Sequence, residues 1–327
     1  MTPSLDQLDL QLLQALQLDG RAPFSRIAAA LGVSDQTVAR RFRRLQTQAG
    51  LRVLGMTDES RVGRSNWIVR LRCTPDMSER LADALARRPD TSYVALISGG
   101  SEVVCEIRPR SRAARDELLL GRLQRTPRVI GFSAHCLLHR FYGGPLRWLQ
   151  KANALSAEQE AALRPAPLDA AAPGTVTVDD TDEALLAALF RDGRTGLADL
   201  QRACGQSEDV VRRRLDRLRG NGALYFAVQY LPEHVGREIG AMLWLTVAPS
   251  ALAAAGHALA EHAEVEFAAA ATGQTNIIAA VRCRGTEELY AYLNDKIGAL
   301  DGIRTVETAL MLRQIKQLAL APAAVPD

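Results

Sequence analysis

The sequence predicts an α+β protein in which one pair of unlike domains occurs twice. Asp19-Gly20-Arg21 recurs as Asp192-Gly193-Arg194, which begins 173 residues later. Further matches at this shift pair Asp6, Asp9, Leu12, Leu13, Ala15, Leu16, Gly32, Ser34, Arg40, Arg41, Arg44 and Leu45 with Asp179, Asp182, Leu185, Leu186, Ala188, Leu189, Gly205, Ser207, Arg213, Arg214, Arg217 and Leu218. A repeat of this length indicates two copies of one unit in a single chain. Within each copy the apolar spacing is first that of helices and then that of strands.

The first helices of each copy can be followed in the first one. Leu5 to Leu18 has leucines at helical spacing, and Gly20 is expected to end that helix as a left-handed exit residue. A second, short helix is expected over Ser25 to Leu31, with Gly32 after its end.

The third helix of the copy is rich in arginine. Ser34 is expected to cap it, and it should run to about Gln48. A short helix, a turn with glycine and an arginine-rich helix make the helix-turn-helix arrangement. Leu51 to Met56 is expected to be extended, as a wing or an exit strand. The fold class predicted here is therefore a winged helix-turn-helix domain in each copy.

The remainder of each copy predicts the strand and helix order βαββαβ, a ferredoxin-like unit. In the first copy these elements are expected at Trp67–Cys73, Ser78–Arg88, Tyr93–Ser98, Val103–Arg108, Arg112–Gln124 and Val129–Leu138. In the second copy they are expected at Ala241–Val247, Ala251–His262, Val265–Ala271, Asn276–Arg282, Glu287–Leu300 and Ile303–Leu312. The shift grows to 174 here, since Gly99 matches Gly273.

These patterns divide the chain into five segments and a tail. We expect helix-turn-helix domains at 1–60 and 177–233, ferredoxin-like domains at 64–140 and 238–318, a linker at 141–176 and a frayed tail at 319–327. The linker matches nothing in the second copy, and Ser156 to Leu163 is expected to form a short docking helix within it.

Composition favours a cytoplasmic protein over a secreted or membrane-spanning one. Five cysteines without a CxxC pair suggest reduced thiols, and no signal peptide or membrane-length apolar run is present. No cofactor motif or catalytic set stands out, so we expect neither a cofactor nor catalytic residues. His135 and His139 lie four apart on one strand, but no third ligand is evident and no metal site is predicted.

The repeat unit resembles the Lrp/AsnC (feast/famine) family of transcription regulators. The resemblance rests on Leu5-Asp6-x-x-Asp9-x-x-Leu12-Leu13, Asp19-Gly20-Arg21, Ala29-x-Leu31-Gly32-Val33-Ser34 and Val38-x-x-Arg41-x-x-x-Leu45, followed by a βαββαβ domain. It covers the chain apart from the linker and the tail. The tandem arrangement departs from the family, most members of which carry one copy and dimerise.

The third helix of the first copy is the predicted reader of double-stranded DNA. Val38, Phe42 and Leu45 form its buried stripe, and glutamine and arginines occupy the opposite face. Glutamine can hydrogen-bond an adenine edge, and arginine a guanine edge or a phosphate. The predicted DNA-binding residues of this copy are Ser34, Gln36, Thr37, Arg40, Arg41, Arg43 and Arg44.

The corresponding helix of the second copy carries acidic residues. Asp209 and Asp216 occupy the positions of Gln36 and Arg43, and carboxylates repel phosphates. Arg213, Arg214 and Arg217 still supply positive charge and are included among the predicted DNA-binding residues. We therefore predict that the first helix-turn-helix dominates DNA binding and that the second assists it or serves packing.

The resemblance implies that small effectors, often amino acids, bind where ferredoxin-like domains pair, near the turn between their middle strands. The implied effector-binding residues are Ser98, Gly99, Gly100, Ser101 and Glu102 in one turn, and Thr272, Gly273, Gln274, Thr275 and Asn276 in the other. Many relatives carry an aspartate that could hold the ligand's amino group, where this chain has Glu102 and Asn276. A ligand-free pair of tight turns is the alternative.

Two such domains in one chain can form the pair that relatives make from two chains. We expect this intrachain pseudo-dimer to associate further into a homo-oligomer, without contact with a membrane.

Two rival functions stay open. Sirohaem decarboxylases resemble this family and can be fused in tandem, but their active sites use histidine beside an aromatic turn. The strands Tyr93–Ser98 and Val265–Ala271 contain no histidine. The other rival is a partner-binding protein with a vestigial DNA contact.

Overall fold

The computed structural model describes residues 5–123, 125–144, 151, 153–164, 174–230 and 237–318. They form two compact units, each of which combines corresponding parts of the two sequence copies. Unit 1 comprises residues 1–63 and 149–234, and unit 2 comprises 64–148 and 235–327. The helix-turn-helix segments share unit 1, and the ferredoxin-like segments share unit 2.

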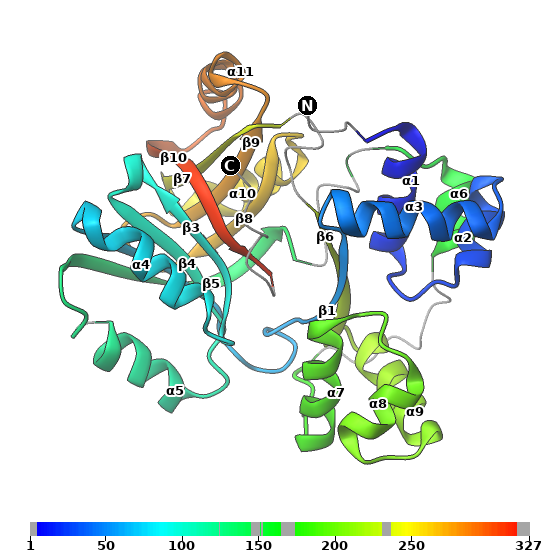
Figure 1. Cartoon of the computed structure of the whole chain (residues 1–327). Coiled ribbons are helices and arrows are strands. Elements are labelled where there is room, and N and C mark those ends of the chain that lie inside the picture. Colours follow the sequence, from blue (N-terminus) through cyan, green and yellow to red (C-terminus); the bar gives the residue numbers. More distant parts are fainter. Residues whose placement is uncertain are drawn as a thin grey trace. The chain divides into compact units, whose positions relative to one another are not determined.

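Unit 1 contains two three-helix bundles on either side of a two-stranded ribbon (Figure 1). The first copy supplies α1 (Gln7–Leu18), α2 (Phe24–Leu31), α3 (Asp35–Gln48) and β1 (Arg52–Thr57). The second supplies α7 (Asp180–Arg191), α8 (Leu197–Cys204), α9 (Glu208–Gly220) and β6 (Leu224–Gln229). Strands β1 and β6 pair antiparallel, from Arg52 opposite Gln229 to Thr57 opposite Leu224. The segment expected as a wing or exit strand is thus one half of a ribbon shared by both copies.

The helix ends of the first bundle agree with the sequence at two positions and differ at a third. Gly32 is left-handed, with φ of 68°, and the Ser34 hydroxyl accepts a hydrogen bond from the Thr37 amide at 3.2 Å. The prediction of a left-handed Gly20 is wrong, because α1 ends through an extended Asp19 and the φ of Gly20 is not positive. Glycine is needed there for space, since a Cβ would lie 2.6 Å from the Cβ of Phe226.

The expected linker helix is α6 (Ala157–Leu163), capped by Ser156. It packs against α1 and α2 of the first bundle (Figure 1). The Gln14 side chain donates to Glu160 at 2.8 Å and accepts from the Ala154 amide at 2.8 Å. The second bundle has Ala187 at the position of Gln14, and an alanine side chain can make neither hydrogen bond. The linker helix therefore makes the first bundle different from the second.

Unit 2 is a closed barrel of eight antiparallel strands, in the order β10-β3-β4-β2-β5-β8-β9-β7. The first copy supplies β2 (Trp67–Cys73), α4 (Pro75–Ala86), β3 (Thr91–Ile97), β4 (Glu102–Ile107), α5 (Arg112–Asp116) and β5 (Val129–Tyr142). The second supplies β7 (Ile239–Val247), α10 (Leu252–Glu261), β8 (Val265–Ala271), β9 (Ile277–Cys283), α11 (Thr286–Ala291) and β10 (Ile303–Gln317). Each copy forms a four-stranded ferredoxin-like sheet, and the pairs β3–β10 and β5–β8 join the two sheets.

Strands β5 and β10 are longer than the sequence predicted. The predicted ends were Leu138 and Leu312, but the strands continue to Tyr142 and Gln317. Their extra residues pair with the other copy, as where Tyr142 lies opposite Ala268. The end of β5 therefore replaces the beginning of the expected linker. The last helix of each half is also divided, because α5 and α11 each continue as a π-helical segment, Glu117–Arg122 and Tyr292–Ile297.

Three apolar clusters lie among the described residues of the barrel. One lies between the helices and sheet of each copy, and the third lies between the two sheets, where Ile68, Trp244 and Ile278 pack together. This third cluster positions the two middle-strand turns on one scaffold. Among the described helices, none is long and apolar enough to cross a membrane.

Candidate functional site

The first candidate site is the exposed face of α3. Ion pairs with α1 hold this helix in place. Asp6 caps α1 by accepting from the Asp9 amide at 2.9 Å, and the Asp9 carboxylate accepts from the Asp6 amide at 3.2 Å. Asp9 is only 1% exposed. A carboxylate so deeply buried needs charged partners to offset the loss of its hydration.

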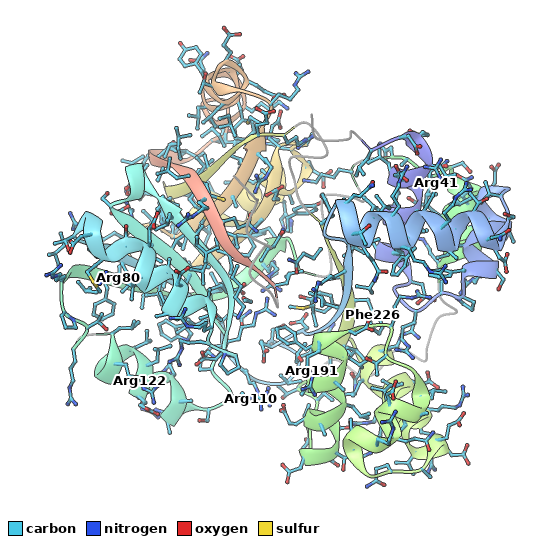
Figure 2. The ribbon with its side chains drawn as sticks, in the orientation of Figure 1. Arg41, Arg80, Arg110, Arg122, Arg191 and Phe226 are labelled. Carbon is cyan, nitrogen blue, oxygen red and sulfur yellow. The ribbon has the colours of Figure 1, made fainter. Side chains whose placement is uncertain are left out.

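Two arginines of α3 supply those partners. Arg41, labelled in Figure 2, donates to Asp6 at 2.6 Å and to Asp9 at 2.8 Å. Arg44 donates to the other oxygen of Asp9. Burial opposes the charge on Asp6, but hydrogen bonds from Arg41 and the Asp9 amide outweigh it and hold the pKa of Asp6 below its usual value. Arg41 and Arg44, both predicted to contact DNA, thus hold α3 against α1.

The remaining predicted residues of α3 face solvent. Arg40, Arg43 and Gln36 are exposed, and neither arginine forms an ion pair within the described part of the chain. The Ser34 and Thr37 hydroxyls lie 2.9 Å apart at the start of the helix. The exposed face of α3 therefore carries the charge of two arginines against one carboxylate, that of Asp35.

Helix α9 has the same anchor with a different face. Arg214 donates to Asp179 and Asp182 at 2.8 and 2.9 Å, and Arg217 donates to Asp182. The amide of Asp182 and the guanidinium of Arg214 hold the pKa of Asp179 below its usual value. The anchoring role of Asp9 and Asp182 was not predicted from the sequence. The signal was present, because both aspartates recur with their arginines at the shift of the repeat.

The outer face of α9 carries more acidic than basic side chains. Arg212 is paired with Glu208 at 2.6 Å, and Arg213 donates to the backbone oxygen of Asp209 at 3.4 Å. Asp209 and Asp216 are exposed. Two arginines here face three carboxylates, so the predicted contrast between the two helices extends to Arg212 and Glu208.

The two bundles exchange arginines across the ribbon. Arg21 donates to the backbone oxygens of Gly193 and Thr195 at 2.8 and 2.9 Å. Arg194 donates to those of Gly20 and Ala22 at 2.7 and 3.0 Å. These are the arginines of the repeated Asp-Gly-Arg motif. The motif follows the first helix of each copy, and its arginine also joins that copy to the other one. Burial lowers the pKa of both arginines from the usual value.

The second candidate site is the turn between β3 and β4. Ser98, Gly99 and Gly100 are all left-handed, with φ of 54°, 68° and 82°. The Glu102 carboxylate accepts from Arg70 at 2.7 and 3.0 Å and from the Ser98 hydroxyl at 2.7 Å. Ser101 donates from its hydroxyl to the Ser98 carbonyl at 2.8 Å. The predicted residues of this turn are brought together, and Arg70 joins them.

Residues of the corresponding turn between β8 and β9 form hydrogen bonds with neighbouring strands. The Asn276 side chain accepts from the Val247 amide and donates to the Val247 carbonyl, both at 2.8 Å. Thr272 accepts from the Cys136 amide, and its carbonyl is 2.7 Å from the His135 ring. Gly273, with φ of 119°, packs against the same ring. The Gln274 carbonyl accepts from the Thr246 hydroxyl at 3.2 Å, and Thr275 beside it is half-buried.

The two histidines predicted to lie on one face of β5 contact different neighbours. The His135 ring lies between Thr272 and the Ser133 hydroxyl, whereas the His139 ring is 4.8 Å from that of Phe141. The pairing of β5 with β8 shifts register between Leu137 and His139. No group of three or more potential metal ligands was found among the described residues.

Comparison with known proteins gives matches in both copies. The AsnC-type helix-turn-helix domain matches residues 5–46 and 178–219, and the Lrp/AsnC ligand binding domain matches residues 240–320. An uncharacterised HTH-type transcriptional regulator of Pyrococcus furiosus is 33% identical over 135 residues, which are 41% of this chain and 91% of the relative. One of Pyrococcus abyssi is 31% identical over 137 residues, which are 42% of this chain and 87% of the relative.

Solved structures of one enzyme match along the length of the chain. The siroheme decarboxylase NirDL has a TM-score of 0.64 and 13% sequence identity, with 97% of this chain and 94% of that chain covered. At this identity the likeness concerns the fold. The family is given by the sequence matches: this chain belongs to the Lrp/AsnC family, with the AsnC-type helix-turn-helix domain present twice in one polypeptide.

Proposed function

We propose that this protein is a sequence-specific transcriptional regulator that binds double-stranded DNA in the cytoplasm and responds to a small-molecule effector. The observation that carries the proposal is the face of α3. Arg41 and Arg44 are fixed to the buried Asp9 of α1, while Gln36, Arg40 and Arg43 are exposed. An anchored helix with free polar side chains can enter a major groove without losing its own packing.

The roles of the predicted DNA-binding residues then divide. Arg40 and Arg43 contact DNA directly, together with Gln36. Ser34 caps the helix by accepting from the Thr37 amide, and the hydroxyls of both residues lie where a phosphate could be bound. Arg41 and Arg44 are positioning residues, which act on DNA through the orientation of α3.

The second helix, α9, contributes less to affinity. Arg214 and Arg217 are its positioning residues, and Arg213 faces outward beside Asp209 and Asp216. Carboxylates near phosphates oppose binding. Helix α9 therefore contacts one half of a DNA site weakly while α3 reads the other.

We place the effector at the turn between β3 and β4. Its left-handed glycines allow a ligand to approach the backbone closely, and Glu102 and Arg70 offer both charges. A ligand amino group would compete with Arg70 for Glu102. The turn between β8 and β9 is the weaker candidate, because both ends of the Asn276 amide already bond to Val247. Calorimetry against amino acids should give heat that Glu102→Gln removes and Asn276→Asp leaves in place.

The proposal assigns no reaction to the barrel. The decarboxylase likeness concerns the fold, and β3 and β8 contain no histidine. The His135 ring is within hydrogen-bond distance of Thr272 and Ser133 at its two nitrogens. If the protein bound an iron porphyrin tightly and had no affinity for DNA, the enzyme would be the better interpretation.

The direct experiment measures binding of the full chain to the DNA upstream of its own gene, over a range of salt concentrations. Arg40→Ala with Arg43→Ala should reduce the slope of log affinity against log salt by about 2, because each lost phosphate contact contributes about 0.9. The matched control is Arg80→Ala with Arg110→Ala, two exposed arginines of unit 2 that are labelled in Figure 2. Equal losses in both variants, or no binding to this and neighbouring promoters, would overturn the proposal.

A further inference from the structure

Two residues at the same position of the two copies meet inside the barrel. Arg70 lies opposite Val104 in the β2–β4 pairing, and Trp244 lies opposite Ile278 in the β7–β9 pairing. Both residues of the second pair follow those of the first by 174 positions, the shift of this part of the repeat. Arg70 and Trp244 are therefore structural equivalents.

Their contact places them at the approximate twofold axis that relates the two sheets. The Arg70 guanidinium carbon is 4.3 Å from the centre of the Trp244 ring, and Trp244 is 2% exposed. Equivalent residues touch each other only close to such an axis. In a symmetric pair of sheets this position would bring one residue against a copy of itself, whereas here a cation meets an aromatic face.

The neighbouring carboxylates are also divided between the copies. Arg70 donates to Glu102 of its own half at 2.7 Å and to Glu307 of the other half at 2.6 Å. The position of Glu102 is occupied by Asn276 in the second half, and that of Glu307 by Ser133 in the first. Burial opposes the charge on Arg70, but hydrogen bonds to Glu307 and Glu102 outweigh it and raise the pKa of this arginine.

A pair made of two first halves or of two second halves would lose the contacts of Arg70 with Trp244 and Glu307. Two first halves would bring two Arg70 side chains together at the axis, where their charges repel. Each would keep its own Glu102, but neither would find Glu307. Two second halves would bring two Trp244 rings together, with two Glu307 carboxylates and no arginine. Only unlike halves combine the cation, the ring and both carboxylates.

Some contacts between the two bundles of unit 1 also occur in one direction only, without an equivalent in the other direction. Arg219 lies 3.5 Å from Asp19 of the first bundle, but the equivalents of these residues are Gln46 and Asp192, which cannot form an ion pair. Arg194 lies 4.7 Å from the Phe24 ring centre. The equivalent of Phe24 is the aliphatic Leu197.

We propose that the barrel face of each half is a recognition surface for the unlike half, and that the Arg70–Trp244 contact with Glu102 and Glu307 excludes like pairs. The partner that fits the first half is thus the second half, and not a second copy of the first half from another chain. The specificity also separates this chain from relatives that pair through identical domains.

Cysteine pairs in the full chain can distinguish the two pairings. Ile97 on β3 lies opposite Met311 on β10, and Leu137 is the equivalent of Met311 in the first half. In the unlike pair, Leu137 lies opposite Ala271 instead. Ile97→Cys with Met311→Cys should therefore form a disulfide within one chain. Ile97→Cys with Leu137→Cys would form one between chains only if two first halves paired.

The chains are unfolded under reducing conditions, refolded and oxidised, and the products are separated by size without reductant. The unaltered chain is oxidised in parallel to account for the five natural cysteines. We expect the intrachain product from the first pair and almost no interchain product from the second. Abundant interchain disulfide from the second pair would overturn the proposal.

Adding Arg70→Trp makes the two halves alike at the axis. The interchain product should then rise roughly tenfold, which is the change that about 1.4 kcal/mol of lost preference produces. Arg70→Lys keeps the charge and should keep the product low, which separates loss of specificity from general damage. Circular dichroism confirms that each variant has refolded. If folded Arg70→Trp gives no rise, the contact does not set the pairing.

Discussion

At Asp9 a single buried carboxylate holds two arginines of the recognition helix. Asp182 does the same in the second bundle, with a nearly identical set of distances. Removing one partner of a buried ion pair leaves the other charge without compensation, which is more destabilising than the loss of an exposed pair. Asp9 and Asp182 are therefore expected to contribute to stability as well as to the orientation of α3 and α9.

Asp9→Asn should lower the free energy of unfolding by about 2 kcal/mol, since Arg41 and Arg44 lose a charged acceptor and are themselves partly exposed. Urea unfolding measures this loss. Asp182→Asn is the matched variant and should cost a similar amount, but it should reduce DNA affinity less. A loss below about 0.5 kcal/mol for Asp9→Asn would show that the anchor is unimportant.

Lys316 should make stability depend on pH above neutrality. It donates to the Arg88 carbonyl at 2.7 Å, and burial lowers its pKa to about 8 from 10.5. Between pH 8 and 10.5 the unfolded chain binds more protons than the folded chain at this site, so the cost of burying the charge disappears as pH rises. Relative to Lys316→Met, the natural chain should gain about 2 kcal/mol across this range. Parallel stability curves for the two chains would contradict this assignment.

Among the elements, the local patterns were easier to predict than the contacts between copies. The apolar periods and caps located α3, β2 and β8 because those signals lie within the elements themselves. The ends of β5 and β10 could not be predicted, because their last residues are held by strands of the other copy. The same cause explains Gly20, whose small size matters to Phe226 across the ribbon.

The candidate sites show the same limit. Arginines at the right spacing predicted a DNA-binding face, but spacing alone could not separate Arg40 from Arg41, because the difference lies in Asp9, about thirty residues earlier. The turn with Glu102 was predicted as a unit, while its partner Arg70 lies on another strand.

Helix α6 should stabilise the first bundle alone. Gln14 accepts from two successive amides ahead of α6 and donates to Glu160 within it. Gln14→Ala, which introduces the residue of the second copy, leaves these buried groups without partners and should cost about 1 to 3 kcal/mol. It should also speed proteolysis between residues 153 and 164. Ala187→Gln in α7 is the reciprocal control at a half-buried position and should change neither, and equal effects would contradict a specific docking role.

Across the whole molecule, the Arg21 and Arg194 exchange should fix the spacing between the two DNA-contacting helices. Both arginines cross from one bundle to backbone oxygens of the other within unit 1. We expect the natural chain to prefer one separation of half-sites, near one turn of DNA. Arg21→Ala with Arg194→Ala should broaden that preference in a binding assay over a spacing series. An unchanged preference would mean that other contacts set the spacing.

At this scale the protein is a pair of unlike copies in one chain. The cores and the anchors are common to both, whereas α3 differs from α9, Glu102 differs from Asn276, and Arg70 differs from Trp244. Fusion allows the positions nearest the axis to differ, which identical subunits cannot do. Under the proposed function, fusion also lets α3 bind DNA more strongly than α9.

The predicted difference between α3 and α9 can be measured by exchanging their outer faces and determining DNA affinity. Gln36→Asp with Arg43→Asp gives α3 the charges of α9, and Asp209→Gln with Asp216→Arg does the reverse. We predict that the first variant loses most of its affinity and salt dependence, and that the second gains affinity with a steeper salt slope. Unchanged affinity in the first variant, or a loss of affinity in the second, would contradict this prediction.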